Sequence, residues 1–262
     1  MNASNASLRN GVKEKLARGE TVYSMTSRLV RTFDIASIAY TAGFDSIYID
    51  MEHSSYSLEA AGQVCMACIG LDVTPFVRVP SPDPHFIARV LDSGALGIIV
   101  PSVQSAEDAR AIVRAAKHAP LGERSVAGAP PQFHYRSLPA VDATRQLDDA
   151  TMIIAMIESL EGLDAVEEIA AVDGIDILLV GANDLSSALG VSGEMDHELV
   201  RNAYRRVLDA CLANNKVLGV GGLGSRPDLI KELVALGARY VSTGNDISFL
   251  LAAAIQKRQQ FA

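Results

Sequence analysis

Tryptophan is absent from this chain, and aromatic residues make up only 5% of its 262 residues. The core must therefore consist mainly of alanine, valine, leucine and isoleucine, a composition that suits helices packed against a parallel sheet. No run of 18 or more apolar residues occurs, so no segment is long enough to cross a membrane as a helix. The net charge of −8 argues against a nucleic-acid-binding surface. We therefore expect neither a membrane nor a nucleic acid as a partner.

Cysteine is also scarce, with Cys65, Cys68 and Cys211 as its three positions. Cys65 and Cys68 fall within a helical pattern, and the second cysteine pair that a zinc site needs is missing. We therefore expect these thiols to pack in the core. The odd number of cysteines and a polar N-terminus without the apolar core of a signal peptide favour a cytoplasmic protein.

Short β-rich runs alternate with helical patterns along the whole chain, and we count eight of these runs. This alternation predicts an α/β fold, a (β/α)₈ TIM barrel that forms a single domain over residues 1–262. An open doubly wound sheet would carry a glycine-rich fingerprint after its first strand, whereas the match at Gly219–Gly224 comes near the end of the chain. The predicted strands are Thr21–Met25, Asp45–Asp50, Thr74–Val79, Gly97–Pro101, Met152–Ile157, Ile175–Val180, Lys216–Val220 and Ala238–Thr243, and the predicted helices are Asp34–Ala42, Leu58–Ile69, Pro84–Asp92, Ala106–His118, Leu163–Ala171, Glu198–Asn214, Arg226–Leu236 and Asp246–Arg258.

The segment Ala119–Asp149 interrupts this alternation with several prolines and glycines. A long loop without regular structure is usually functional or disordered. We interpret it as an active-site or oligomer-contact loop, in which Arg124, His134, Tyr135 and Arg136 face substrate or a neighbouring subunit. The alternative is a solvated or purely structural role for each of these four residues.

The sequence Asp50-Met51-Glu52-His53 directly follows the second predicted strand. Buried carboxylates and imidazoles are energetically costly, and the C-terminal ends of barrel strands are where catalytic residues lie. Asp50 and His53 are close enough in a tight turn for the carboxylate to orient the ring, as a general base requires. The alternative is a polar loop with a capping acid.

Other polar residues follow neighbouring strands. Glu158 and Asp184 follow the fifth and sixth predicted strands, and two carboxylates so placed can share a hard divalent cation such as Mg²⁺. Arg78 lies in an apolar strand, where it can hold a carboxylate or stabilise an enolate oxygen. Helix caps for the two carboxylates and an internal salt bridge for Arg78 are the alternatives. No lysine stands at an identified strand end, which argues against a Schiff base.

Several short motifs together resemble those of the HpcH/HpaI aldolase family, the metal-dependent class II pyruvate aldolases. The resemblance implies His53 as general base, Arg78 as stabiliser of the transition state and Asp92 as the acid that raises the basicity of the histidine. It further implies a Mg²⁺, Mn²⁺ or Co²⁺ cofactor on Glu158 and Asp184, and a homohexamer, a trimer of dimers that exchange the final helix. The motifs are Ala42–Asp45, Ile49–His53, Val77–Pro80, Leu91–Ala95, Val100–Pro101, Ile157–Ser159 and Val180–Ser186.

This chain departs from the family pattern at three positions, two of which, Met156 and Ala182, are expected to contact substrate. Met156 stands where these aldolases carry a glutamine, Ala182 replaces a proline, and Ser125 replaces a glycine. Asn183 is expected to contact substrate through its backbone, next to Asp184. Because methionine lacks the amide hydrogen bond, the preferred 2-oxo acid is expected to differ.

The resemblance and the strand-end residues together predict a lyase. We expect reversible retro-aldol cleavage of a 4-hydroxy-2-oxo acid to pyruvate, or a related 2-oxo acid, and an aldehyde. A citrate-lyase or malyl-CoA-type lyase, an oxaloacetate decarboxylase and a non-catalytic barrel that serves as a scaffold are the alternatives.

Overall fold

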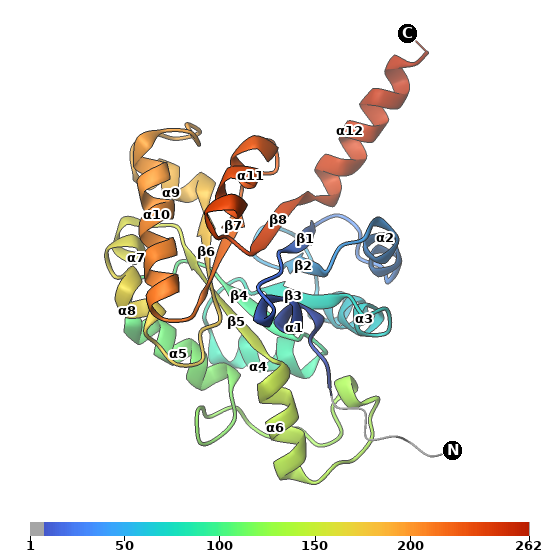
Figure 1. Cartoon of the computed structure of the whole chain (residues 1–262). Helices are drawn as coiled ribbons and strands as arrows, with labels where there is room; N and C mark the ends of the chain where they lie inside the picture. The colour runs from blue at the N-terminus through green and yellow to red at the C-terminus, as the bar shows by residue number, and fades with distance from the viewer. Residues whose placement is uncertain (1–7, 262) are drawn as a thin grey trace.

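The computed structural model describes residues 8–261 and contains a closed barrel of parallel strands in the order β1 to β8 (Figure 1). Each strand is hydrogen-bonded to the next along the chain, and β8 closes the barrel against β1. This arrangement confirms the predicted (β/α)₈ architecture and excludes the open sheet. The strands are β1 (Val22–Ser27), β2 (Ser46–Asp50), β3 (Thr74–Arg78), β4 (Gly97–Val100), β5 (Met152–Ile157), β6 (Ile177–Gly181), β7 (Val217–Gly221) and β8 (Tyr240–Asn245).

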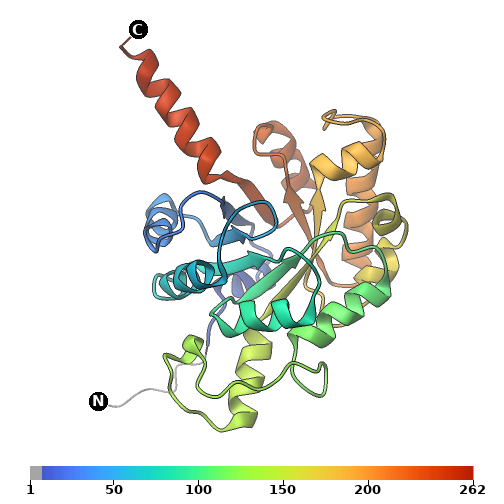
Figure 2. The same ribbon diagram turned by 180° about the vertical axis from the view of Figure 1, so that it is seen from behind.

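Helices surround the barrel, as the view from behind also shows (Figure 2). Most of the predicted helices are present, but the one predicted over Leu163–Ala171 is two short helices, and the helices at Gly11–Ala17, Ala140–Ala150 and Ala182–Ala188 were not predicted. None of the helices described is both long and apolar enough to span a bilayer. The helices are α1 (Gly11–Ala17), α2 (Asp34–Ala42), α3 (Leu58–Ile69), α4 (Pro84–Asp92), α5 (Ala106–Ala116), the 3₁₀ turn η1 (Pro131–Phe133), α6 (Ala140–Ala150), α7 (Leu160–Asp164), α8 (Val166–Ala170), α9 (Ala182–Ala188), α10 (Glu198–Ala213), α11 (Pro227–Leu236) and α12 (Asp246–Gln259).

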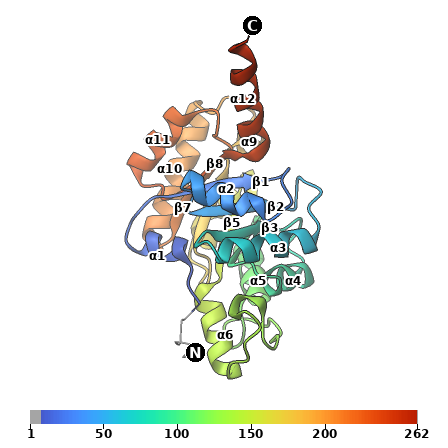
Figure 3. The ribbon, with the colours of Figure 1, turned by 90° about the vertical axis from the view of Figure 1, so that its right-hand side faces the viewer.

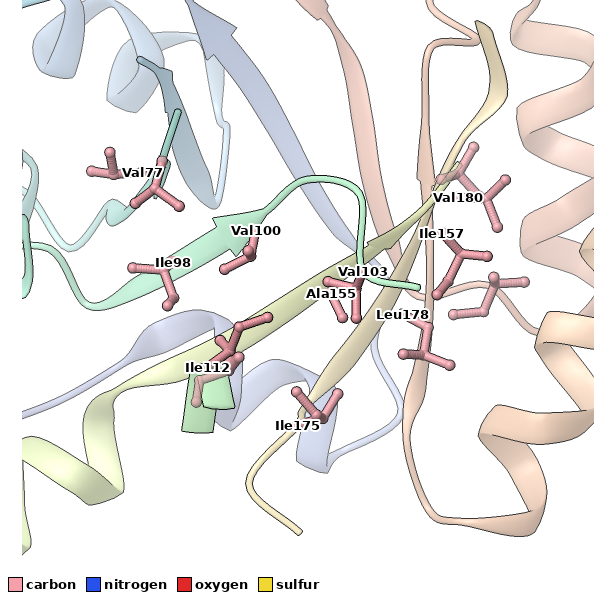
Figure 4. Close-up of a cluster of buried hydrophobic side chains, with 14 of the residues drawn as sticks. Val77, Ile98, Val100, Val103, Ile112, Ala155, Ile157, Ile175, Leu178 and Val180 are labelled. Atoms are coloured by element: carbon pink, nitrogen blue, oxygen red, sulfur yellow. The ribbon is translucent and has the colours of Figure 1, made fainter. Parts of the chain in front are cut away.

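The alternation of side chains along each strand creates two apolar layers. One layer lies between strands and helices, where Val77, Ile98 and Leu178 pack among other branched side chains (Figure 4). The second layer fills the inside of the barrel and includes Tyr48, Phe76, Ile154 and Tyr240. Because successive residues of a strand point to opposite faces, the inward series ends in polar residues at the C-terminal ends. These are Asp50 on β2, Arg78 on β3 and Glu158 just after β5.

The cysteines pack in the core, as the sequence predicted, and the glycines of 219–224 serve close packing. All three cysteines are free and buried. A Cβ on Gly219 would lie 2.9 Å from Cδ1 of Leu179, and one on Gly224 would lie 2.6 Å from the carbonyl oxygen of Thr243. These glycines therefore permit close packing between strands and loops.

The segment 119–149 is more ordered than predicted, because it contains η1 and most of α6. Helix α6 leads directly into the N-terminal end of β5, and Figure 3 shows it at the end of the molecule opposite α12. The side chain of Gln146 in α6 accepts a hydrogen bond from the backbone of Leu8. Within one chain this segment is therefore remote from the C-terminal ends of the strands.

Candidate active site

A cavity of about 660 Å³ opens at the C-terminal ends of the strands, and we call it the mouth cavity. Most of the residues predicted for the site line it, namely Asp50, His53, Arg78, Met156, Ala182, Asn183 and Asp184. Arg124, His134, Tyr135 and Arg136 are not among its lining residues. The prediction that these four face substrate is therefore not supported within one chain.

Asp50 and Arg78 form a buried ion pair on adjacent strands. They are direct register partners, and Nε and Nη2 of Arg78 donate to the two oxygens of Asp50 at 3.0 and 2.7 Å. Burial alone would raise the pKa of Asp50, but the hydrogen bonds and charge of Arg78 hold that pKa below its usual value. Asp50 is therefore ionised and fixes the plane of the guanidinium.

Glu52 binds the same guanidinium from the other side. Nη1 of Arg78 lies 2.9 Å from Oε2 of Glu52, and the Arg78 guanidinium lies 5.3 Å from the ring centroid of Tyr48. Burial raises the pKa of Glu52, although the charge of Arg78 opposes that shift. A guanidinium has five N–H groups, so those not bonded to the two acids remain available to a substrate oxygen. The salt bridge and the substrate-binding role suggested for Arg78 are thus compatible.

His53 is oriented differently from the prediction. Oδ1 of Asp50 accepts hydrogen bonds from the backbone N–H groups of Glu52 and His53, both at 3.1 Å, and none from the imidazole. The carboxylate near the ring is Glu52, whose Oε2 lies 3.7 Å from Nε2 of His53. Asp50 therefore shapes the turn that carries His53, and the prediction that it orients the ring is wrong. The ring is more than half exposed, so a ligand in the cavity can reach it.

Glu158 is positioned by the loop after β4. Its Oε1 accepts hydrogen bonds from the backbone N–H of Ser102 at 2.7 Å and from the Ser102 hydroxyl at 3.1 Å. Its Oε2 faces β6, because a Cβ on Gly181 would lie only 2.7 Å from this oxygen. Helix α7 is capped by Ser159, so Glu158 is not its cap.

Asp184 lies in the first turn of α9 and lines the mouth cavity. The N-cap position of this helix is Gly181, so the cap alternative fails for Asp184 as well. Oxygen atoms of Glu158 and Asp184 are hard ligands of the kind that Mg²⁺ and similar ions prefer. Residues 8–261 contain no group of three or more His, Cys, Asp or Glu side chains arranged to hold a metal. A two-carboxylate site whose other ligands are water and substrate oxygens fits these residues.

Asp92 lies elsewhere in the chain. It is the last residue of α4, close to the start of β4, and its Oδ1 accepts a hydrogen bond from Nη2 of Arg124 at 2.6 Å. Since His53 follows the C-terminal end of β2, the two residues are at opposite ends of the barrel. The role predicted for Asp92 in raising the basicity of His53 is therefore not supported within one chain.

Two residues at the mouth of the barrel, Arg28 and Asp246, were not among the predicted site residues. The first strand extends to Ser27, two residues beyond its predicted end, so Arg28 stands at a strand end and lines the mouth cavity. Asp246 begins α12 and is buried, and its carboxylate accepts hydrogen bonds from the backbone of residues 28–30. The one indication of Arg28 in the sequence was that a basic residue stands shortly after the first predicted strand.

Comparisons with known proteins agree with this geometry. The profile of the HpcH/HpaI aldolase/citrate lyase family matches residues 30–253. The chain is 37% identical over 252 residues to 4-hydroxy-4-methyl-2-oxoglutarate aldolase of Hapsidospora irregularis, covering 94% of this chain and 93% of that protein. It is 32% identical to hydroxypyruvate/pyruvate aldolase of Delftia acidovorans, with 94% and 90% covered.

A solved structure shares the whole fold. The HpcH/HpaI aldolase of Desulfitobacterium hafniense superimposes with a TM-score of 0.89 at 29% identity, and 97% of each chain is covered. These findings confirm the resemblance seen in the sequence motifs, together with the predicted fold and lyase class. The chain belongs to the HpcH/HpaI aldolase/citrate lyase family, whose aldolases break and form carbon–carbon bonds.

Proposed function

We propose that this protein is a divalent-metal-dependent aldolase that cleaves 4-hydroxy-2-oxo acids to pyruvate, or a related 2-oxo acid, and a carbonyl compound. The observation that carries the proposal is the placement of Glu158 and Asp184 at neighbouring strand ends, beside the cavity that Arg78 and His53 line. The aldolase names of the relatives, among them 4-hydroxy-4-methyl-2-oxoglutarate aldolase, support the same reaction class.

The side chains suit distinct parts of this reaction. A divalent ion held by Glu158 and Asp184 would supply Lewis acidity toward the keto oxygen of the substrate. Arg78 lines the cavity, and those of its N–H groups that the two acids do not bind can stabilise negative charge on the oxygen at C2. Asp50 and Glu52 fix that guanidinium in advance, so it does not reorganise when the charge develops.

His53 is proposed to take the proton from the C4 hydroxyl. The C3–C4 bond then breaks, its electrons form the enolate of the 2-oxo acid, and the C4 hydroxyl carbon becomes the carbonyl of the leaving product. Protonation of the enolate at C3 then gives pyruvate. No lysine is among the described residues that line the mouth cavity, so no amine is positioned to form a Schiff base.

The assembly and location are further parts of the proposal. Helix α12 extends away from the barrel and exposes Leu250, Leu251 and Ile255 (Figures 1 and 3). These apolar side chains support a homo-oligomer in which α12 packs on another subunit, as in a trimer of dimers. The three free, buried cysteines support a cytoplasmic location.

Pyruvate proton exchange in deuterated water tests the function without requiring knowledge of the second substrate. We expect exchange with added Mg²⁺, Mn²⁺ or Co²⁺, and none after chelation or in Glu158→Ala and Asp184→Ala. His53→Ala should slow aldol cleavage by roughly 10²- to 10⁴-fold, the usual contribution of a general base, and should retain pyruvate binding. Exchange that persists fully in chelator would refute the metal site.

A further inference from the structure

The mouth cavity has two chemically different sides. The side formed by β2, β3 and β6 carries Asp50, His53, Arg78 and Asp184. The side formed by β7, β8, β1 and the start of α12 is lined by hydroxyl and amide groups, namely Thr26, Ser225, Ser242, Thr243, Asn245 and Ser248. Among the described lining residues, Arg28 is the one charged side chain on this second side. Arg28 shares its nearest carboxylate, Asp50, with Arg78, and a cation at this place in the cavity favours an anionic ligand.

Asp246 holds the segment that carries Arg28 in place. Its Oδ1 accepts from the backbone N–H of Arg28 at 3.0 Å, and its Oδ2 accepts from those of Leu29 and Val30 at 2.9 and 2.8 Å. The Tyr56 hydroxyl donates to the carbonyl oxygen of Val30. Arg28 is therefore attached to a fixed backbone at the rim of the cavity.

The guanidinium of Arg28 has unused hydrogen-bonding capacity. Nη2 donates to the carbonyl oxygen of His53, whereas Nε is buried and has no hydrogen-bond partner. Oδ2 of Asp50 lies 3.3 Å from this Nε, but the same oxygen already accepts from Arg78 at 2.7 Å. The Arg28 side chain is about one-third exposed, at 35%, so a ligand can reach it.

Resting on the proposed function, we propose that Arg28 binds a carboxylate on the carbonyl half of the substrate. The substrate class is then a 4-hydroxy-2-oxo acid with a carboxylate on C4, and the acceptor in the reverse reaction is an oxo acid. The planar guanidinium matches a carboxylate with paired hydrogen bonds, and the nearby hydroxyl and amide groups can donate to the remaining lone pairs of the carboxylate oxygens. The 2-oxo acid half is held on the opposite side, near Arg78.

The test compares two acceptors of equal carbon number in aldol addition to pyruvate with Mg²⁺. Glyoxylate carries a carboxylate where glycolaldehyde carries a hydroxymethyl group. We expect Arg28→Gln to lower the ratio of kcat/KM for glyoxylate to that for glycolaldehyde by about 10- to 100-fold, the value of a hydrogen bond to a charged group. Arg28→Lys keeps the positive charge but loses the paired N–H groups of the guanidinium, and it should lower the ratio less.

Arg31→Gln is the matched control, because Arg31 is exposed, bonds to the Ser55 hydroxyl and does not line the cavity. Its ratio should equal that of the wild type. An equal fall for both acceptors in Arg28→Gln would overturn the inference, since Arg28 would then act only through the turn at His53. Absence of pyruvate proton exchange in the wild type would instead refute the proposed aldolase, and the inference with it.

Discussion

Asp50 is one buried carboxylate that positions two functional groups. It bonds the guanidinium of Arg78 through both oxygens and the backbone of the His53 turn through one of them. Its charge is thus compensated by Arg78 and by backbone N–H groups. Because both groups depend on it, a change at Asp50 should affect stability as well as catalysis.

We predict that Asp50→Asn lowers the free energy of unfolding by about 2–3 kcal/mol at pH 7, the range for hydrogen bonds between charged groups. The folded pKa of Asp50 is lowered, so its contribution is present above the unfolded pKa and is lost as the pH falls through the folded pKa. The difference between the proteins should therefore shrink in acid. Urea unfolding at several pH values measures it, with the exposed Asp149→Asn as control. A difference that grows in acid would contradict the assignment.

Met156 is the residue that we expect to influence the choice of 2-oxo acid most directly. It is buried in the inner layer with Tyr48 and Leu179 and lines the mouth cavity. We predict that Met156→Gln increases the affinity for pyruvate by up to roughly tenfold, since it adds one ordinary hydrogen bond. The same substitution should weaken the binding of 2-oxobutanoate, because the extra methyl group of this ligand loses an apolar neighbour.

Calorimetric titration with both oxo acids checks this prediction. Met195→Gln, outside the mouth cavity, serves as the control. Unchanged affinity for both ligands in Met156→Gln would mean that this side chain does not contact the oxo acid.

At the level of elements, sequence periodicity identified the strands and the longer helices because their apolar patterns are regular. The bounds of α2, α3, α4 and β5 are as predicted. Helix α6 was missed because the surrounding prolines and glycines suggested a loop, and α9 because its residues read as the end of a strand. The shared position of Asp50, Arg78 and Asp184 at the mouth followed from strand parity and topology. The contacts of His53 and Asp92 did not, because they depend on turn geometry and on which end of the barrel a helix reaches.

Lys117 joins two elements at the far end of the barrel. It follows α5 and donates to the carbonyl oxygens of Asp148 and Thr151, both at 2.6 Å, where α6 ends. Burial lowers its pKa to about 8. An unfolded lysine keeps its proton to about pH 10.4, so between these values the unfolded state binds more protons and stability rises with pH.

We predict that the stability of the wild type relative to Lys117→Met rises by up to about 3 kcal/mol between pH 8 and 10.5, taking 1.36 kcal/mol per pKa unit. Urea unfolding of both proteins across this range measures the change. Lys13→Met is the matched control, because Lys13 also donates to a carbonyl oxygen of α6 but is solvent-exposed. If the difference in free energy of unfolding between the wild type and Lys117→Met did not change with pH, the buried amine would not titrate in this range.

At the scale of the whole molecule, α12 is the feature that one chain leaves unpacked. It follows β8 and extends beyond the barrel, and most of its side chains are exposed, including Leu250, Leu251 and Ile255. Contiguous exposed apolar side chains indicate an interaction surface. The first two turns of α12 differ from the rest, because Ser248, Phe249 and Ala252 line the mouth cavity.

We predict that the double variant Leu251→Glu, Ile255→Glu dissociates the proposed homo-oligomer, since two charges would be buried at its interface. Sedimentation velocity should give a smaller species, while circular dichroism should remain that of the folded barrel. Gln256→Glu with Gln259→Glu adds the same charge to this helix and should leave the assembly intact. A wild type that sediments as a monomer would refute the proposed oligomer.

The carboxylate of Asp246 also connects the start of α12 to the loop that follows β1. It bonds the backbone of residues 28–30, which precede it by more than 200 positions in the sequence. During synthesis on a ribosome, that loop remains without its partner until more than 200 further residues have been added. The rim that carries Arg28 therefore gains this support only when α12 begins, and a prematurely terminated chain that lacks α12 keeps the other strand ends but not the carboxylate that holds this rim.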